Sequence, residues 1–375
     1  MKKKIISLLL VLALVVGICP AAFAAPIVVT EMEEIYAIAR NAPLHYLPTA
    51  NWTDVDIVKT TPLFDLDGNI VAYCIDLYHA KTDAYAYVFV NADPKGYPIL
   101  QYSPDGTSPY YNETTGRALF LSAGQYLIEH EEMITVLNTN ETVSKTAVLE
   151  QYEQQTKEIA YQLNTETSEK QDFSAYRANY IAGIAPLAFD TKEKTLSKVP
   201  NWQWRKGCAP TAVAMQIANL LPTVPANRND MIDKLAEYMK TDSVKGTTDF
   251  KDITKGAQNY VADCNFTKTT IALWEDETWS GTPRLGPDYN PYSSFVSEIN
   301  YGRAVCIYSA NATIQTTGYD GWGAHMITGI GYCYSTVNSQ EKSVIVYTTN
   351  VADGRVYIPI YGTALGDYAW FKIVQ

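Results

Sequence analysis

Cys208 is the residue whose surroundings most favour chemistry. It follows a glycine, and the run from Thr211 to Leu221 is apolar at all but three positions. Pro210 suits the first turn of a helix, because it lacks the N–H that a helix start leaves unpaired. The sequence therefore predicts a buried helix beginning at Cys208. A thiol there feels the positive end of the helix dipole, which favours the nucleophilic thiolate.

A cysteine nucleophile needs a base, and histidine is the usual one because its ordinary pKa is ~6.5. The chain has four histidines, of which only His325 lies in the same half as Cys208. It begins a strand-like run just after Gly321-Trp322-Gly323, where glycines allow the backbone to approach a partner closely. An inert thiol and a surface histidine are the alternative. Cys208 and His325 occur in the same half of the chain, with the cysteine first and glycines beside both. This combination favours a thiol–imidazole site.

A third group should hold the imidazole. Asn350 ends the run VIVYTTN, where its amide can accept the imidazole N–H, and Asp353 is the alternative, although Asp353-Gly354 also suits a plain turn. Acyl transfer further needs donors for the oxyanion. The backbone N–H of Cys208 is one, and the side chain of Gln203 is a candidate for the second, unless it is simply a surface glutamine.

These stretches resemble the papain-like cysteine peptidases, and most closely the bacteriocin-processing (double-glycine) peptidase-like proteins and the streptopain group. The resemblance rests on GCAPTAVAMQIANLL, INYGRAVCIYS and GAHMITGIGY, and it covers about residues 199–373. It implies Cys208 as nucleophile, His325 as base, Asn350 or Asp353 as the orienting group and Gln203 as oxyanion donor.

The first half has a fainter likeness. PLFDLDGNIVAYCIDL and AYVFVNADPKGYPILQYSPDG are similar to the propeptides of streptopain-like zymogens. That likeness implies a small sheet domain that blocks the catalytic cleft until it is removed. We therefore expect a signal peptide at 1–24, a propeptide-like inhibitory α+β domain at 25–190, and a papain-like peptidase domain at 191–375.

The first 24 residues have the pattern of a secretory signal: three lysines, an apolar run from Ile5 to Ile18, and Ala22-Phe23-Ala24 as the cleavage site. Ile18 before Cys19 is too large for a lipoprotein signal. Losing the three lysines moves the formal charge from −11 to −14, which disfavours binding to nucleic acid or to anionic membranes. We expect an exported, soluble protein.

The remaining chemistry-bearing residues do not indicate a cofactor or a metal. Five cysteines remain after the signal, widely spaced and odd in number, which fits neither a disulfide framework nor a zinc site. Asp65, Asp67 and Gly68 suit a hairpin turn, because the later ligands of a calcium loop are missing.

Coarse patterning predicts an α+β fold. In the first half it predicts a helix over Glu31–Arg40 and a meander of antiparallel strands from Pro62 to Tyr102, with turn residues between them. Helices are then expected over Leu119–Glu132 and Ser144–Leu163, and a polar linker over Phe189–Lys198.

In the second half, helices come first and strands second. Besides the helix after Cys208, three helices are expected, over Asp230–Met239, Phe250–Ala262 and Tyr292–Asn300. Six strands are expected, over Phe266–Leu273, Ala304–Tyr308, His325–Tyr334, Val344–Thr349, Arg355–Tyr361 and Tyr368–Val374.

The sequence thus predicts a secreted cysteine peptidase made as a preproprotein. Its expected partners are a protein or peptide substrate and its own N-terminal domain as inhibitor. Two alternatives remain open: another papain-like acyl chemistry, such as cell-wall peptide cleavage or transglutamination, and a surface-binding protein that has lost its activity.

Overall fold

A long, mostly antiparallel sheet joins the strands of the described residues. The computed structural model describes residues 31–46, 52, 54–121, 124, 126–137, 141–149, 172–183, 191–221, 227–243, 246–264, 272–275, 291–310, 325–335, 342–349, 354–360 and 367–374. The predicted signal peptide, Asn350 and Asp353 lie outside these residues.

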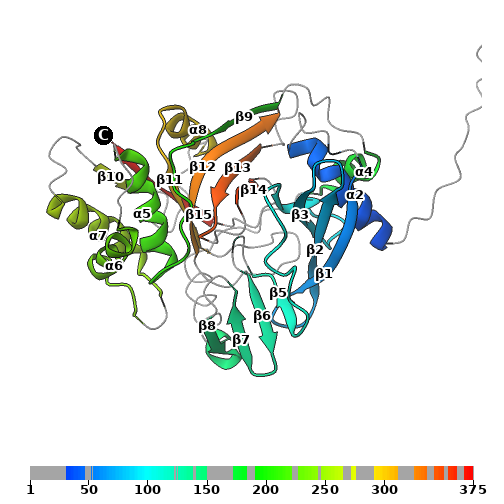
Figure 1. The fold of residues 1–375 in the computed structure, drawn as a ribbon, viewed down its shortest axis with the longest axis horizontal. Coiled ribbons are helices and arrows are strands. Elements are labelled where there is room, and N and C mark those ends of the chain that lie inside the picture. Colours follow the sequence, from blue (N-terminus) through cyan, green and yellow to red (C-terminus); the bar gives the residue numbers. More distant parts are fainter. Residues whose placement is uncertain are drawn as a thin grey trace, which may run out of the picture. The chain divides into compact units, whose positions relative to one another are not determined.

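The helices and strands follow one another as labelled in Figure 1. The helices are α2 (Glu31–Tyr46), α4 (Ser174–Ile181), α5 (Cys208–Leu220), α6 (Arg228–Tyr238), α7 (Phe250–Asp263) and α8 (Pro291–Asn300). The strands are β1 (Asp56–Phe64), β2 (Ile70–His79), β3 (Ala84–Asn91), β4 (Ile99–Ser103), β5 (Arg117–Leu119), β6 (Leu127–His130), β7 (Met133–Val136), β8 (Glu141–Ser144), β9 (Thr191–Thr195), β10 (Ala272–Glu275), β11 (Val305–Ala310), β12 (His325–Ser335), β13 (Lys342–Tyr347), β14 (Val356–Pro359) and β15 (Asp367–Val374).

The predicted meander is confirmed. Strands β1 to β4 pair antiparallel in chain order. The β1–β2 turn is held by Asp65, whose carboxylate accepts hydrogen bonds from the backbone and side-chain amides of Asn69 at 2.7 and 2.9 Å. Gly68 in this turn has φ +90°, a conformation that glycine adopts without strain. Asp65 and Gly68 therefore stabilise a hairpin turn, as the sequence predicts.

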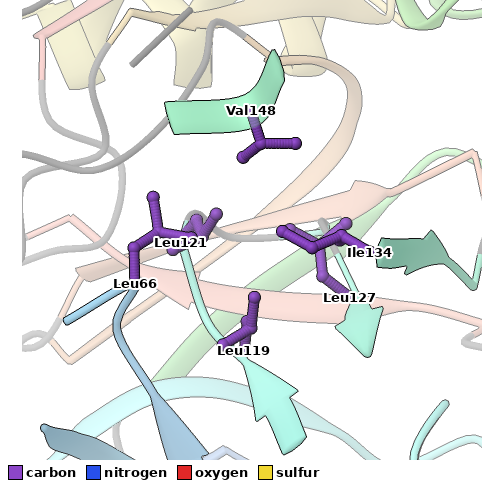
Figure 2. Packing of buried hydrophobic residues seen from close by; sticks show 6 residues of the cluster. All are labelled: Leu66, Leu119, Leu121, Leu127, Ile134 and Val148. Carbon is purple, nitrogen blue, oxygen red and sulfur yellow. The ribbon is translucent and has the colours of Figure 1, made fainter. Parts of the chain in front are cut away.

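The helix predicted over Leu119–Glu132 is wrong. This stretch begins at the last residue of β5 and contains β6, which leads into β7 through a turn at Glu131, where φ is +51°. Gly124, at φ +77°, also breaks any continuous helix. The apolar residues serve strands that share one core, in which six side chains point toward one another (Figure 2): Leu66, Leu119, Leu121, Leu127, Ile134 and Val148.

Two further predictions concern the middle of the chain. The helix expected over Ser144–Leu163 is confirmed at residues 145–149, directly after β8, and the remainder lies outside the described residues. The polar linker expected over Phe189–Lys198 contains β9, which pairs with β12. Its lysines and glutamate fit an edge strand, where charged side chains stay in water and discourage pairing with other chains.

The second half follows the predicted order of elements, with most ends differing by a few residues. The strand predicted over Phe266–Leu273 overlaps β10 only at its end, and its earlier residues lie outside the described residues. Helix α5 packs against β12 and β11, and α8 packs against β12, β11 and β9 (Figure 1). The strand order is β10-β15-β11-β12-β13-β14, all antiparallel. The α+β class is therefore confirmed.

The sheet continues from β14 to β4 of the meander, where Tyr357 pairs with Tyr102. Beside this pair, the guanidinium of Arg355 donates two hydrogen bonds to the carboxylate of Asp105, at 2.8 and 3.0 Å. Residues 35–375 form one compact unit, so the domain boundary predicted after residue 190 falls inside it and stays a prediction. Among the described residues, no helix is both long and apolar enough to span a membrane.

Candidate functional site

Cys208 is the first residue of α5, as predicted. The loop before it passes very close to a second loop. A Cβ added at Gly207 would lie only 2.6 Å from the carbonyl oxygen of Gly246 and 3.0 Å from Cγ2 of Thr241. Since no side chain fits there, glycine is required beside the cysteine for this packing.

Thr211 fixes the loop that carries Cys208. Its buried hydroxyl accepts a hydrogen bond from the backbone N–H of Arg205 at 3.1 Å and lies 2.7 Å from the carbonyl oxygen of Gly207, to which it donates. The guanidinium of Arg205 in turn donates two hydrogen bonds to Asp233 of α6, at 2.7 and 2.6 Å. The cysteine therefore sits at the end of a braced loop.

His325 is the first residue of β12 and directly precedes a residue that contacts Cys208. The backbone N–H of Met326, the residue after the histidine, donates a hydrogen bond to the sulfur of Cys208. Further along, the hydroxyl of Thr328 donates to the carbonyl oxygen of Ala212 at 3.2 Å, which ties β12 to the first turns of α5. The start of β12 is thus brought to Cys208 through Met326, and a direct contact between the thiol and the imidazole of His325 stays a prediction.

The imidazole of His325 is buried, with 5% of its surface exposed. The backbone carbonyl of Thr348 accepts a hydrogen bond from the ring. Nε2 has no hydrogen-bond partner among the described residues, so we assign that bond to Nδ1. Burial lowers the pKa of His325 to about 4, against a smaller upward effect of the Thr348 carbonyl. The ring is therefore neutral at pH 7.

Cys208 is half-buried, but its sulfur is well shielded from water. Desolvation raises the pKa of its thiol, because the charged thiolate loses its hydration. The backbone N–H groups of Met326, Ala209 and Cys208 itself act in the opposite direction. Desolvation outweighs them, so this state pairs a thiol with a neutral imidazole, not a thiolate with an imidazolium.

The group predicted to orient the imidazole lies outside the described residues, whether it is Asn350 or Asp353. The segment just before them does reach the site. Thr349 accepts a hydrogen bond from the backbone N–H of Trp204 at 2.7 Å, next to the carbonyl of Thr348 that holds His325. Thr349 has φ +69°, which is strained for a β-branched residue and is typical of functional sites.

Gln203, the predicted oxyanion donor, is exposed. It lies beside Trp204 and so within the segment that contacts Thr349. Its role as a donor stays a prediction.

Gly124 also lies at the site, and nothing in the sequence pointed to it. A Cβ added there would be 3.4 Å from Nε2 of His325 and 3.1 Å from two side-chain carbons of Thr348. Its backbone N–H donates to Oε1 of Gln101 at 3.4 Å. The amide nitrogen of this buried glutamine donates to the hydroxyls of Tyr87 and Tyr126, at 3.0 and 2.8 Å. The first half of the chain thus covers the free nitrogen of the imidazole.

The other candidates for chemistry do not join this site. His79 is buried and stacks on Trp52 at 5.2 Å between ring centroids. No group of three or more His, Cys, Asp or Glu that suits a metal occurs in the described part of the chain. Among the described residues, no disulfide joins any two of the five cysteines that follow the predicted signal: Cys74, Cys208, Cys264, Cys306 and Cys333.

Comparisons with known proteins add no assignment: no family model and no curated protein matches this chain.

Proposed function

We propose that the chain is a secreted cysteine peptidase, made as a preproprotein with an N-terminal signal peptide, and that the structure corresponds to its latent form. Its substrates are proteins or peptides, and its own N-terminal half is an intramolecular inhibitor. The papain-like family is part of this proposal and rests on the sequence resemblance.

The observation that carries the proposal is the hydrogen bond from the Met326 N–H to the sulfur of Cys208. It supports a nucleophile–base pair, because it joins the thiol at a helix N-terminus to the residue next to the buried histidine. In the reaction, the sulfur attacks the peptide carbonyl carbon and the imidazole takes the thiol proton. The imidazole then gives that proton to the leaving amine, and water hydrolyses the thioester to release the acid and restore the thiol.

The remaining roles follow from position. The backbone N–H of Cys208 lies at the start of α5 and donates to the oxyanion, with Gln203 as the second donor. Asn350, or Asp353, completes the orientation of an imidazole that the Thr348 carbonyl already contacts.

Latency is supported by the contact between Gly124 and Nε2 of His325. A base whose free nitrogen is covered by the N-terminal half is not accessible to a substrate. The raised pKa of the Cys208 thiol and the lowered pKa of His325 both follow from burial, which fits a closed site. Removal of the N-terminal half hydrates both groups and moves both pKa values toward their ordinary range.

A surface-binding protein without catalytic activity is the second candidate. The observation that favours it is the neutral state of both groups, since an active thiol–imidazole pair needs the sulfur to lose its proton. Other acyl chemistry, such as cell-wall peptide cleavage or transglutamination, uses the same residues and differs only in substrate.

The experiment compares the wild-type chain with Cys208→Ala and His325→Ala on unfolded casein and on peptidoglycan, before and after removal of the N-terminal half. The peptidase proposal predicts casein hydrolysis by the processed wild type only. Release of peptidoglycan fragments with casein uncut would indicate cell-wall chemistry. Equal behaviour of all three chains in every assay would favour the binding protein.

A further inference from the structure

Strand β9 pairs with β12, which belongs to the second half of the chain. Residues Thr191 to Thr195 pair antiparallel with Ser335 to Gly331 of β12. Just after the strand, the backbone N–H of Leu196 donates to the carbonyl oxygen of Ile330 at 2.8 Å, and the Leu196 side chain is buried. Within β12, strand β11 pairs only with residues 325–329. Strand β9 pairs with the remaining end of β12, which β11 does not reach.

The backbone of β9 passes so close to Gly331 that no side chain fits at this position. A Cβ at Gly331 would lie 2.3 Å from the carbonyl oxygen of Lys194 and 3.0 Å from the Cα of Thr195. Both atoms belong to the backbone, so a side chain at residue 331 would displace β9 as a whole. The close approach depends on glycine at this position.

Side chains reinforce the pairing. The hydroxyl of Tyr357 donates to Oε1 of Glu193 at 2.9 Å. The ammonium of Lys194 donates to the carbonyl oxygen of Asn300, the last residue of α8, at 3.2 Å. These partners lie in α8 and β14, within the part of the chain that carries Cys208 and His325.

Helix α4, the described element before β9, is bound to the other half. The guanidinium of Arg177 donates to the carbonyl oxygen of Asn91 at 2.9 Å, and the N–H of Phe173 donates to the carbonyl oxygen of Lys95 at 2.9 Å. Asn41 donates to the carbonyl oxygen of Tyr180 at 2.7 Å. Helix α4 therefore contacts the first half of the chain, whereas β9 contacts the second half.

We propose that β9 is a permanent part of the catalytic half, so that the C-terminal product of zymogen processing begins at or before Thr191. This inference rests on the proposed function. Processing hydrolyses one peptide bond before β9, with water supplying the hydroxyl of the new carboxylate and the hydrogen of the new amine. A cut after Thr195 would instead strip β12 of a hydrogen-bonded neighbour and leave Gly331–Ser335 as an unpaired edge.

The test uses the full chain with Cys208→Ala, which prevents self-cleavage, and a glutamyl endopeptidase as probe. Glu193 is the only glutamate between Thr191 and Ala236, so cleavage after it reports on β9 alone. We expect Glu193 to resist cleavage in this chain. Adding Gly331→Ala should raise the rate by about tenfold or more, because displacing β9 opens the site locally.

Gly329→Ala is the matched control. It changes a glycine in the same strand, but its Cβ would meet Phe295 and the carbonyl oxygen of Val305, not β9. Cleavage after Glu193 should then stay slow. If Gly331→Ala fails to fold, Tyr357→Phe replaces it, since it removes only the hydroxyl that holds Glu193, and a smaller rise is expected.

Equal cleavage rates with and without these changes would overturn the inference. So would a C-terminal product of wild-type processing that begins at or after Leu196, as read from its intact mass. Absence of any self-processing would count against the peptidase proposal, whereas the Glu193 result would still decide where β9 belongs.

Discussion

Gly124 lies beside His325, so that a methyl group added at its Cα would be in van der Waals contact with Nε2 of the imidazole, at 3.4 Å. The glycine belongs to the half of the chain that carries no candidate catalytic residue, and the histidine is the proposed base. If the proposed peptidase function holds, this packing would explain a latent chain without any change in the proposed catalytic residues.

Gly124→Ala should therefore activate the unprocessed chain. The new Cβ is crowded against two side-chain carbons of Thr348, at 3.1 Å, and φ +77° is unfavourable for alanine by about 1–2 kcal/mol. Both costs are relieved when the segment leaves the site, so we expect peptide hydrolysis to rise about tenfold. Gly302→Ala is the control, because Gly302 has φ +82° and no atoms within 4 Å of an added Cβ. A rise of the same size in the control would contradict the blocking role of Gly124.

Gln101 should be needed to keep Gly124 in place. Gln101→Leu removes the acceptor of the Gly124 N–H and the donor to two tyrosine hydroxyls. We expect the free energy of unfolding to fall by about 1–3 kcal/mol and the activity of the unprocessed chain to increase. Gln216→Leu removes another buried glutamine, which donates to the carbonyl oxygen of Ala304 at 3.0 Å. It should lose similar stability without any gain in activity.

Acid should weaken the closed state through His325. The pKa of the buried imidazole is about 4, below its ordinary value near 6.5, so opened or unfolded chains bind more protons between these two values. The contribution of His325 to stability is complete above pH 6.5 and is lost as pH falls toward 4. It amounts to roughly 3 kcal/mol.

The measurement is the free energy of unfolding at pH 7 and pH 4.5 for the Cys208→Ala chain with and without His325→Gln. The chain that keeps the histidine should lose about 2–3 kcal/mol more than the glutamine variant on acidification. Equal losses would mean that the imidazole does not resist protonation in the folded state.

Thr211→Val should impair catalysis, although threonine and valine have nearly the same size. The substitution keeps the shape of a fully buried side chain and removes the hydroxyl that holds Arg205 and Gly207. We expect a loss of about 1–3 kcal/mol in stability and a fall in kcat, because the cysteine loop is released. Thr254→Val is the control, since the buried Thr254 hydroxyl has no partner among the described residues. An unchanged kcat in Thr211→Val would show that the loop is held by other contacts.

Local patterns were sufficient for much of the fold. The alternation and turn residues from Pro62 to Tyr102 predict the meander, and the apolar run after Cys208 predicts α5, because each signal is short-range. The prediction failed where tertiary pairing decides the structure. Residues 119–132 carry a mixed apolar pattern that suits a helix, but they include the end of β5 and the whole of β6, because Leu119 and Leu127 share one core with Leu66 and Val148.

The site was predictable only in part for the same reason. Cys208 and His325 are rare residue types with glycines beside them, which makes them visible in the sequence. Gly124 and Gln101 act through a backbone N–H and a buried amide that meet across the fold, and neither leaves a local signal. The strand β9 was missed because a polar edge strand and a linker have the same composition.

The most direct test of the proposed site is competition for one reagent among the five cysteines that follow the predicted signal. The Gly124→Ala chain is treated at neutral pH with a peptide-based electrophile, and the adduct is mapped by mass spectrometry. Cys264 is half-buried like Cys208 and serves as the internal control, whereas Cys74, Cys306 and Cys333 are buried. We predict an adduct on Cys208 alone, which disappears in the additional His325→Ala variant. An adduct on Cys264 with Cys208 unmodified, or labelling of Cys208 that does not depend on His325, would contradict the account.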